Sequence, residues 1–517
     1  MAVAEASKKV GSVTYREAGD EYFGQRKLKR HAGVWSLWAL GVAAVISGDF
    51  SGWNFGLDAG GFGGLLVATL IITVMYFGLC FSIAEMSPAL PHTGGAYSFG
   101  RSAMGPWGGF VTGVGESIEY VVTPAVVVTF IGSYMQSIST DLFGSTPSQP
   151  VWWAICYVLF VGLNLVGTAV TFRFTVAICL LALGILAVFF VGALTQMDFD
   201  KWALNIAAED GGSRWFPLGL DGIFLALPFA IWFYLAIEEL PLAAEESHYP
   251  QRDIPRGTIY GLITLVVAAF LVLFLNTAIA PGAEGIRTSG EPLLDGLKTI
   301  FGSGTSAALL GLIAVAGLVA SFHTIIYAYG RNIFSLSRAG YYPHWLSVTH
   351  ANRQTPHVAL VLGAVIGYGL AYLLYEAGKN GWMGGNLSAA LLSMAVFGAV
   401  ISYIMQMLSF ILLRRKMPDI ERPYRSPVGQ WGAAIAGLIA LASLIALFVR
   451  DDYRPGVVGV AIWFAIAIAY FFFVGRHKLV LSPEEEFAVT HGAHGHPERE
   501  GYGTTHVTGD GNGGTPS

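Results

Sequence analysis

Residues 46–54 read ISGDFSGWN and lie inside an apolar stretch that runs from 34 to 57. A uniform membrane helix would not place two glycines and a carboxylate at this depth, because an unpaired backbone group in hydrocarbon costs several kcal/mol. Irregular backbone survives there only where it is buried in protein or lines a cavity. The stretch therefore predicts a broken helix whose freed amides and carbonyls are available as ligands.

The composition excludes a water-soluble domain. Of the 517 residues, 54% are hydrophobic and 12% are charged, whereas soluble domains carry about 25% charged residues. The net charge of −5 and the lack of a long basic stretch outside the termini exclude nucleic acid as a partner. Runs of about 20 apolar residues, the length that crosses a bilayer, occur at 34–57, 63–88, 106–138, 151–169, 172–194, 216–244, 257–280, 305–331, 357–376, 386–413, 430–449 and 456–475. We expect an all-α integral membrane protein with twelve transmembrane helices.

The basic residues orient these spans. If residues 1–33 are cytoplasmic, 22 of the 29 Lys and Arg residues fall on the inner side and 7 on the outer, which agrees with the retention of positive charge in cytoplasmic loops. The chain then has an N-terminal cytoplasmic segment (1–33), a twelve-helix domain (34–475) and a cytoplasmic tail (476–517). The tail is polar and carries His491, His494 and His496, and we expect it to be disordered rather than metal-binding.

A second irregular stretch lies in the sixth span, where residues 230–241 read AIWFYLAIEELP and place Glu238 and Glu239 beside aromatic residues. Spans one and six are each the first of a set of five. Interrupted helices at matching positions of two halves predict an inverted repeat, here about 34–194 and 216–413 followed by two extra helices (430–475), with a binding site at the repeat interface.

Several segments resemble a known transporter group. Residues 85–101, EMSPALPHTGGAYSFGR, followed by Gly105-Pro106, resemble the amino acid–polyamine–organocation (APC) superfamily, and so do residues 244–256, AEESHYPQRDIPR. Within that superfamily, residues 46–56 and 116–125 are similar to those of bacterial ethanolamine permeases. The resemblance covers residues 35–473. It implies the five-plus-five inverted-repeat (LeuT-like) fold, a bacterial cytoplasmic membrane location, and substrate held between broken helices one and six beside helices three and eight.

Asp49 is the main candidate for binding a substrate ammonium group, because a carboxylate in the break of helix one needs a cationic partner. The alternative is an N-cap that satisfies the amide of Gly52 or a neighbour. Amino-acid carriers of the superfamily usually have Gly-Ser-Gly or Gly-Ala-Gly in this break, whose bare amides bind the substrate carboxylate. Here Gly52-Trp53-Asn54 stands in its place, so we expect a crowded anion nest and a substrate other than an α-amino acid.

Further site residues follow from the resemblance. Glu119 aligns with a pocket residue of arginine and agmatine exchangers, Trp232 with their gating tryptophan, and Glu238 with a glutamate near the site. The alternatives are a neutral buried carboxylic acid for Glu119, a packing role for Trp232, and helix caps for Glu238 and Glu239. The full expected substrate site comprises Ser47, Gly48, Asp49, Phe50, Ser51, Gly52, Trp53, Glu119, Tyr120, Trp232, Tyr234, Leu235, Ala236 and Glu238.

The gate and coupling candidates are Trp232, Glu116, Glu239 and His323. For Glu116 we favour a structural role, and for His323 a hydrogen bond within the bundle over titration. Some superfamily members carry a lysine on helix five in place of a sodium ion, but residues 171–194 contain none.

Together these features predict a secondary transporter that imports protonated ethanolamine by alternating access, driven by a proton gradient or by the membrane potential. The alternatives are a carrier of amino acids, polyamines or choline, and a channel. An enzyme is not expected, because the sequence has neither a His-Glu-x-x-His zinc motif nor a phosphate-binding Gly-Lys-Ser/Thr loop. We expect no cofactor and no metal. The lipid bilayer, the cationic substrate and a co-transported proton are the expected partners, and the sequence predicts no oligomeric state.

Overall fold

A computed structural model describes residues 7–10, 12–16, 18, 20–90, 92–302, 305–381, 387–449, 453–490 and 504–505. Within these residues ten helices are long and apolar enough to cross a membrane, which makes the chain a multi-pass membrane protein. They are α4 (Phe55–Ala89), α5 (Gly95–Phe143), α6 (Gln149–Val166), α7 (Thr168–Leu194), α10 (Pro250–Thr277), α13 (Thr305–Arg338), α14 (His357–Lys379), α15 (Leu387–Lys416), α16 (Gly429–Val449) and α17 (Arg454–Phe473).

The two spans with irregular sequence are broken. The first consists of α2 (Val34–Val45) and α3 (Ser47–Phe50), after which residues 51–54 form a turn that leads into α4. The other consists of α9 (Asp221–Ile231) and the 3-10 helix η1 (Ile237–Glu246), separated by a turn at 232–236. Each break lies within one of the two stretches that the sequence marked as irregular, residues 46–54 and 230–241. Neither half of a broken span is long enough to cross a bilayer by itself, so among the described residues the ten helices named above reach that length, and the count of twelve spans stays a prediction.

The broken helices lie at the centre of the bundle, beside α5 and α13. In both α5 and α13, 78% of the most apolar 18-residue window is buried, compared with 11% in α17 at the periphery. Glycines kink two of the long helices: Gly61 in α4 and Gly105 in α5 have φ angles of 66° and 81°. The second kink separates a short N-terminal part of α5 (residues 95–104) from the span that follows.

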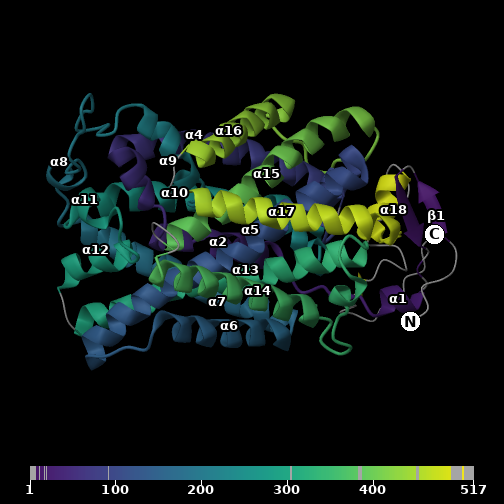
Figure 1. Cartoon of the computed structure of the whole chain (residues 1–517), viewed down its shortest axis with the longest axis horizontal. Helices are drawn as coiled ribbons and strands as arrows, with labels where there is room; N and C mark the ends of the chain where they lie inside the picture. The colour runs from purple at the N-terminus through teal and green to yellow at the C-terminus, as the bar shows by residue number, and fades with distance from the viewer. Residues whose placement is uncertain are drawn as a thin grey trace.

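Short elements gather at the two ends of the bundle (Figure 1). One end carries α8 (Phe199–Trp202), α11 (Gly282–Ile286) and α12 (Pro292–Phe301), and the other carries α1 (Asp20–Gly24), β1 (Ser7–Val10) and α18 (Pro483–Val489). The remaining elements are β2 (Val13–Arg16), β3 (Leu28–Lys29), η2 (His344–Ser347), η4 (Gly475–His477), β4 (Leu479–Val480) and β5 (Thr504–Thr505). We call the second end the α18 end.

The prediction of a disordered tail is wrong for its first part. β4 pairs in parallel with β2, which pairs with β1 in an antiparallel hairpin, and β3 pairs with β5. Glu484 and Glu485 of α18 are fully buried. A polar composition suggested a solvated segment, but these carboxylates bind arginines from distant parts of the chain, Arg338 and Arg101. His491, His494 and His496 lie outside the described residues.

Candidate functional site

The turn at residues 51–54 has fixed hydrogen-bond partners. The indole Nε1 of Trp232 donates to the carbonyl oxygen of Ser51 at 2.9 Å, and the amide of Gly52 donates to Oδ1 of Asn54 at 3.0 Å. The Asn54 amide group in turn donates to the carbonyls of Ile286 and Ser289, at 2.6 and 2.8 Å. The Gly52 amide, which would belong to an anion nest, is therefore already occupied by a side chain.

Asp49 lies on α3, directly before this turn, and is 1% exposed. No donor among the described residues forms a hydrogen bond with either of its carboxylate oxygens. The N-cap interpretation is not supported, because the Gly52 amide bonds to Asn54 and not to Asp49. A buried carboxylate without a donor is unfavourable, so Asp49 is a strong candidate for binding a cation that enters from outside.

The turns of the two broken helices touch each other. A Cβ atom on Gly48 would lie 2.4 Å from the carbonyl oxygen of Trp232, and one on Gly52, whose φ is 97°, would lie 2.5 Å from the Trp232 indole nitrogen. Only glycine allows this approach, because real Cβ contacts are not that short. At the end of the second turn, Ala236 has a φ of 83°, an uncommon conformation for a residue with a side chain.

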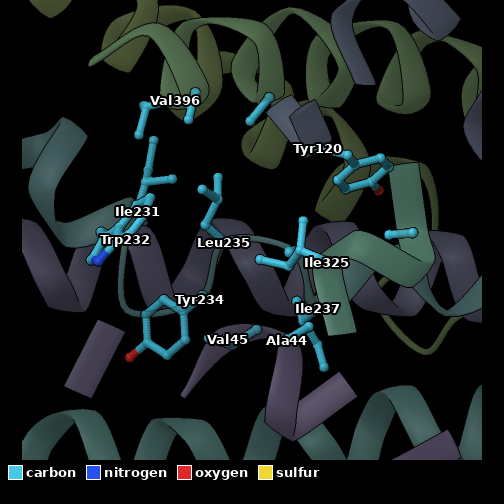
Figure 2. Close-up of a cluster of buried hydrophobic side chains, with 14 of the residues drawn as sticks. Ala44, Val45, Tyr120, Ile231, Trp232, Tyr234, Leu235, Ile237, Ile325 and Val396 are labelled. Atoms are coloured by element: carbon cyan, nitrogen blue, oxygen red, sulfur yellow. The ribbon is translucent and has the colours of Figure 1, made fainter. Parts of the chain in front are cut away.

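Aromatic side chains enclose the two turns. Trp53 is fully buried and stacks on Phe233, with ring centroids 5.6 Å apart and planes at 25°. Figure 2 shows Trp232, Tyr234 and Leu235 at the second turn, within a buried hydrophobic cluster that includes Tyr120. The predicted wall residues Trp53, Trp232 and Tyr234 therefore lie at the two turns, and Tyr120 belongs to the same buried cluster.

Phe50 and Ser47 join helix one to its neighbours. The Phe50 carbonyl accepts a hydrogen bond from the Tyr134 hydroxyl at 2.9 Å, and its ring packs so closely on Gly317 of α13 that a Cβ there would lie 2.3 Å from it. Ser47 Oγ donates to Ser321 Oγ of α13 at 2.9 Å. These contacts hold the break of helix one against α5 and α13.

Two predicted acids meet at the second break. The carboxyl groups of Glu119, on α5, and Glu238, on η1, lie against each other. The Tyr403 hydroxyl donates to Oε1 of Glu119 at 3.3 Å and lies 3.1 Å from the Tyr76 hydroxyl. Sequence reasoning missed Tyr76 and Tyr403, since nothing in their own apolar spans distinguishes them from packing residues.

The remaining acids differ in their surroundings. Glu116 accepts from Asn332 at 3.2 Å and from Tyr120 at 3.5 Å, as a structural role requires. Glu239 is buried and no described donor reaches its carboxylate. Arg331, a buried basic residue of α13, is bound by Glu246, at 2.9 and 3.1 Å.

His323 is turned toward α6 and α7. Its Nδ1 lies 3.0 Å from the amide nitrogen of Asn164, and its ring packs against Phe160 and Phe174. An amide NH₂ is a donor only, so Nδ1 is the acceptor and the ring is held in the bundle. The geometry favours the hydrogen-bonded role over a coupling role.

The chain is similar to known permeases and transporters. A model of the amino acid permease family matches residues 18–482. An uncharacterized transporter of Rhizobium meliloti is 26% identical over 458 residues, which cover 88% of this chain and 94% of the relative. A methylthioribose transporter and a branched-chain amino acid permease, both of Bacillus subtilis, are 24% and 22% identical, and each alignment covers 88% of this chain with 95% and 94% of the relative, respectively.

Proposed function

The chain belongs to the amino acid permease family, and on this premise we propose that it is a secondary transporter that imports protonated ethanolamine. The observation that carries the proposal is Asp49, a buried carboxylate in the break of helix one that no described donor reaches. An ammonium group would supply both the positive charge and the donors that this carboxylate lacks, and charge-assisted hydrogen bonds are strong.

The surroundings of Asp49 favour an amine without a carboxylate. Among the described residues, no ion pair joins Asp49, Glu119, Glu238 or Glu239 to a lysine or arginine. The Gly52 amide bonds to a side chain, so an α-amino acid would find no free amide at this position for its carboxylate. Ethanolamine has one ammonium and one hydroxyl, and both can bond to carboxylates.

The proposed cycle is alternating access in a five-plus-five inverted repeat. Counting each broken pair as one crossing gives twelve crossings, and an even number agrees with β1, α1 and α18 lying at the same end (Figure 1). We assign that end to the cytoplasm and the protein to the bacterial inner membrane. Trp232, whose indole closes over the break of helix one, is the proposed gate.

We propose that the membrane potential or a proton gradient drives uptake. A single positive charge gains about 2.3 kcal/mol per 100 mV on entering a negative-inside cell, which suffices for uptake without a second ion. If a proton is coupled, the contact between Glu119 and Glu238 is the proposed place where it is held.

Uptake of labelled ethanolamine into proteoliposomes under imposed proton, sodium and voltage gradients tests the proposal. We expect saturable uptake with counterflow, driven by an inside-negative potential, and weak competition by leucine, glycine, putrescine and choline. Stronger competition by any of these would reassign the substrate within the family. Single-channel currents would replace the carrier by a channel.

A further inference from the structure

The carboxylate of Glu485, on α18, connects the tail to three other parts of the chain. Glu485 accepts four hydrogen bonds, from the hydroxyls of Tyr15, Tyr97 and Tyr341 at 2.6, 2.7 and 3.0 Å and from Nε of Arg101 at 2.5 Å. These donors come from β2, from the N-terminal part of α5 and from the turn after α13. A single buried residue of α18 thus holds three separate parts of the chain together.

The preceding residue connects α18 to the second half of broken helix six. Arg338 donates through Nη2 to Oε1 of Glu484 at 2.5 Å and to Oε1 of Glu245 at 2.6 Å, and through Nη1 to Oε2 of Glu245 at 3.0 Å. Glu245 lies on η1, and all three side chains are at most 3% exposed. Arg338 is therefore shared between the tail and the helix that carries the break.

The start of helix one is bound to the same place. The amides of His31 and Ala32 donate to the carbonyl of Glu246 at 2.8 and 3.0 Å, and the amide of His248 donates to the carbonyl of Ala32 at 2.9 Å. Arg331 of α13 also binds the side chain of Glu246. The ends of both broken helices are thus fastened to each other, to α13 and, through Arg338, to α18.

We propose that α18 is a latch, built into the chain, that keeps the α18 end of the substrate path closed. The inference rests on the proposed alternating-access function, in which this end must open to release substrate. Opening requires that η1 separates from α13, which breaks the contact of Arg338, the last residue of α13, with Glu245. Glu484 holds the Arg338 guanidinium where it meets Glu245, so this bond stabilises the closed end. α18 therefore acts by stabilising the closed contact between Arg338 and Glu245, and the tail sets how often this end opens.

Ser247 offers a reporter of this opening. It follows η1, is fully buried, and its hydroxyl has no hydrogen-bond partner among the described residues, so Ser247→Cys is a mild substitution. A charged, membrane-impermeant thiol reagent applied from the face that carries α18 can reach this cysteine only when the end opens. The native cysteines Cys80, Cys156 and Cys179 are buried, and the protein without Ser247→Cys gives the background.

Glu484→Gln in the Ser247→Cys protein removes the charge but keeps the size of the side chain. We expect the labelling rate to rise about tenfold, the ratio that corresponds to the loss of one hydrogen bond between charged groups. A chain that ends at Leu481 should be labelled at least as fast. Glu486→Gln, which takes one charge from the partly exposed side of the same helix, is the matched control and should leave the rate unchanged.

Labelling needs no substrate, so it separates the latch from the ethanolamine assignment. Unchanged labelling in well-folded Glu484→Gln protein would overturn the latch even if uptake of ethanolamine is found. Equal increases in Glu484→Gln and Glu486→Gln would overturn it too, because they would indicate general loosening of the tail. If the shortened chain does not fold, the Glu484→Gln rate alone decides.

Discussion

Asp49→Asn is the sharpest perturbation of the proposed site, because it separates a ligand role from a capping role. The substitution keeps the shape of the side chain and removes its charge. In the structure Asp49 is buried and no described donor reaches it, so the change breaks no hydrogen bond within the protein. Only the proposed interaction with substrate is lost.

The expected magnitude follows from that geometry. Removing one partner of a buried charged pair costs about 2–5 kcal/mol, so the affinity for ethanolamine should fall by a factor of roughly 30 or more. The stability of the substrate-free protein should not fall, because an unpaired buried charge is replaced by a neutral amide. Loss of an N-cap would instead cost about 1 kcal/mol of stability.

The assay is binding of labelled ethanolamine to purified protein, with thermal unfolding measured with and without ethanolamine. Asp58→Asn is the matched control, since Asp58 lies nine positions away in the same region and forms a half-exposed ion pair with Arg287 at 3.0 Å. An exposed pair contributes about 0.2–1 kcal/mol, and the control should retain affinity. Near-native affinity in Asp49→Asn, or loss of stability without loss of affinity, would refute the reasoning.

Three other outcomes are expected. Glu119→Gln removes one member of the carboxyl pair with Glu238 and should lower affinity or turnover in proteoliposomes; an unaltered transport curve would assign Glu119 to the scaffold. Trp53→Gly removes the ring that stacks on Phe233 and should lower the free energy of unfolding by about 3–5 kcal/mol, as for other buried aromatic truncations. The space that it leaves should allow choline to compete for uptake. If no bulkier amine competes, Trp53 is not part of the pocket wall. Burial raises the pKa of Glu291, which lies outside the spans, from 4.5 to about 7. Between these pH values the folded state keeps a proton that the unfolded state releases. The free energy of unfolding should therefore fall by up to about 3 kcal/mol as the pH rises from 4.5 through 7. Glu291→Gln should remove that slope in thermal unfolding, and a slope that persists would contradict the assignment.

The positions of the two breaks could be read from the sequence, because each depends on local residues. Glycines and an acid inside an apolar run cannot form a uniform membrane helix, and Gly48 and Gly52 turn out to lie where the other broken helix approaches most closely. The acids inside spans could likewise be identified one by one. Their pairing could not, since the contact of Glu119 with Glu238 joins residues more than a hundred positions apart.

The structure of the tail could not be predicted from its sequence. Its first part is polar, and a polar segment usually remains solvated because it buries little apolar surface. Here Glu485 is buried through four hydrogen bonds to residues from three distant segments. The sequence contains each donor, but it does not show that the fold brings these donors together around one carboxylate. Buried polar networks are therefore harder to predict from one sequence than breaks in a helix.

The buried acids of this chain fall into two groups, those with an arginine partner and those without, and this difference supports the proposal of a cationic substrate. At the α18 end, Glu246 binds Arg331 and Glu485 binds Arg101, at distances between 2.5 and 3.1 Å. At the centre, Asp49 and Glu238 are as deeply buried and have no such partner among the described residues. A permanent arginine at the centre would compensate the charge but would also repel a cationic substrate and occupy its site. In the proposed transporter, an acid left without a fixed cation is unfavourable until an amine binds, so the unpaired charge that destabilises the empty protein is also the proposed source of affinity for the substrate.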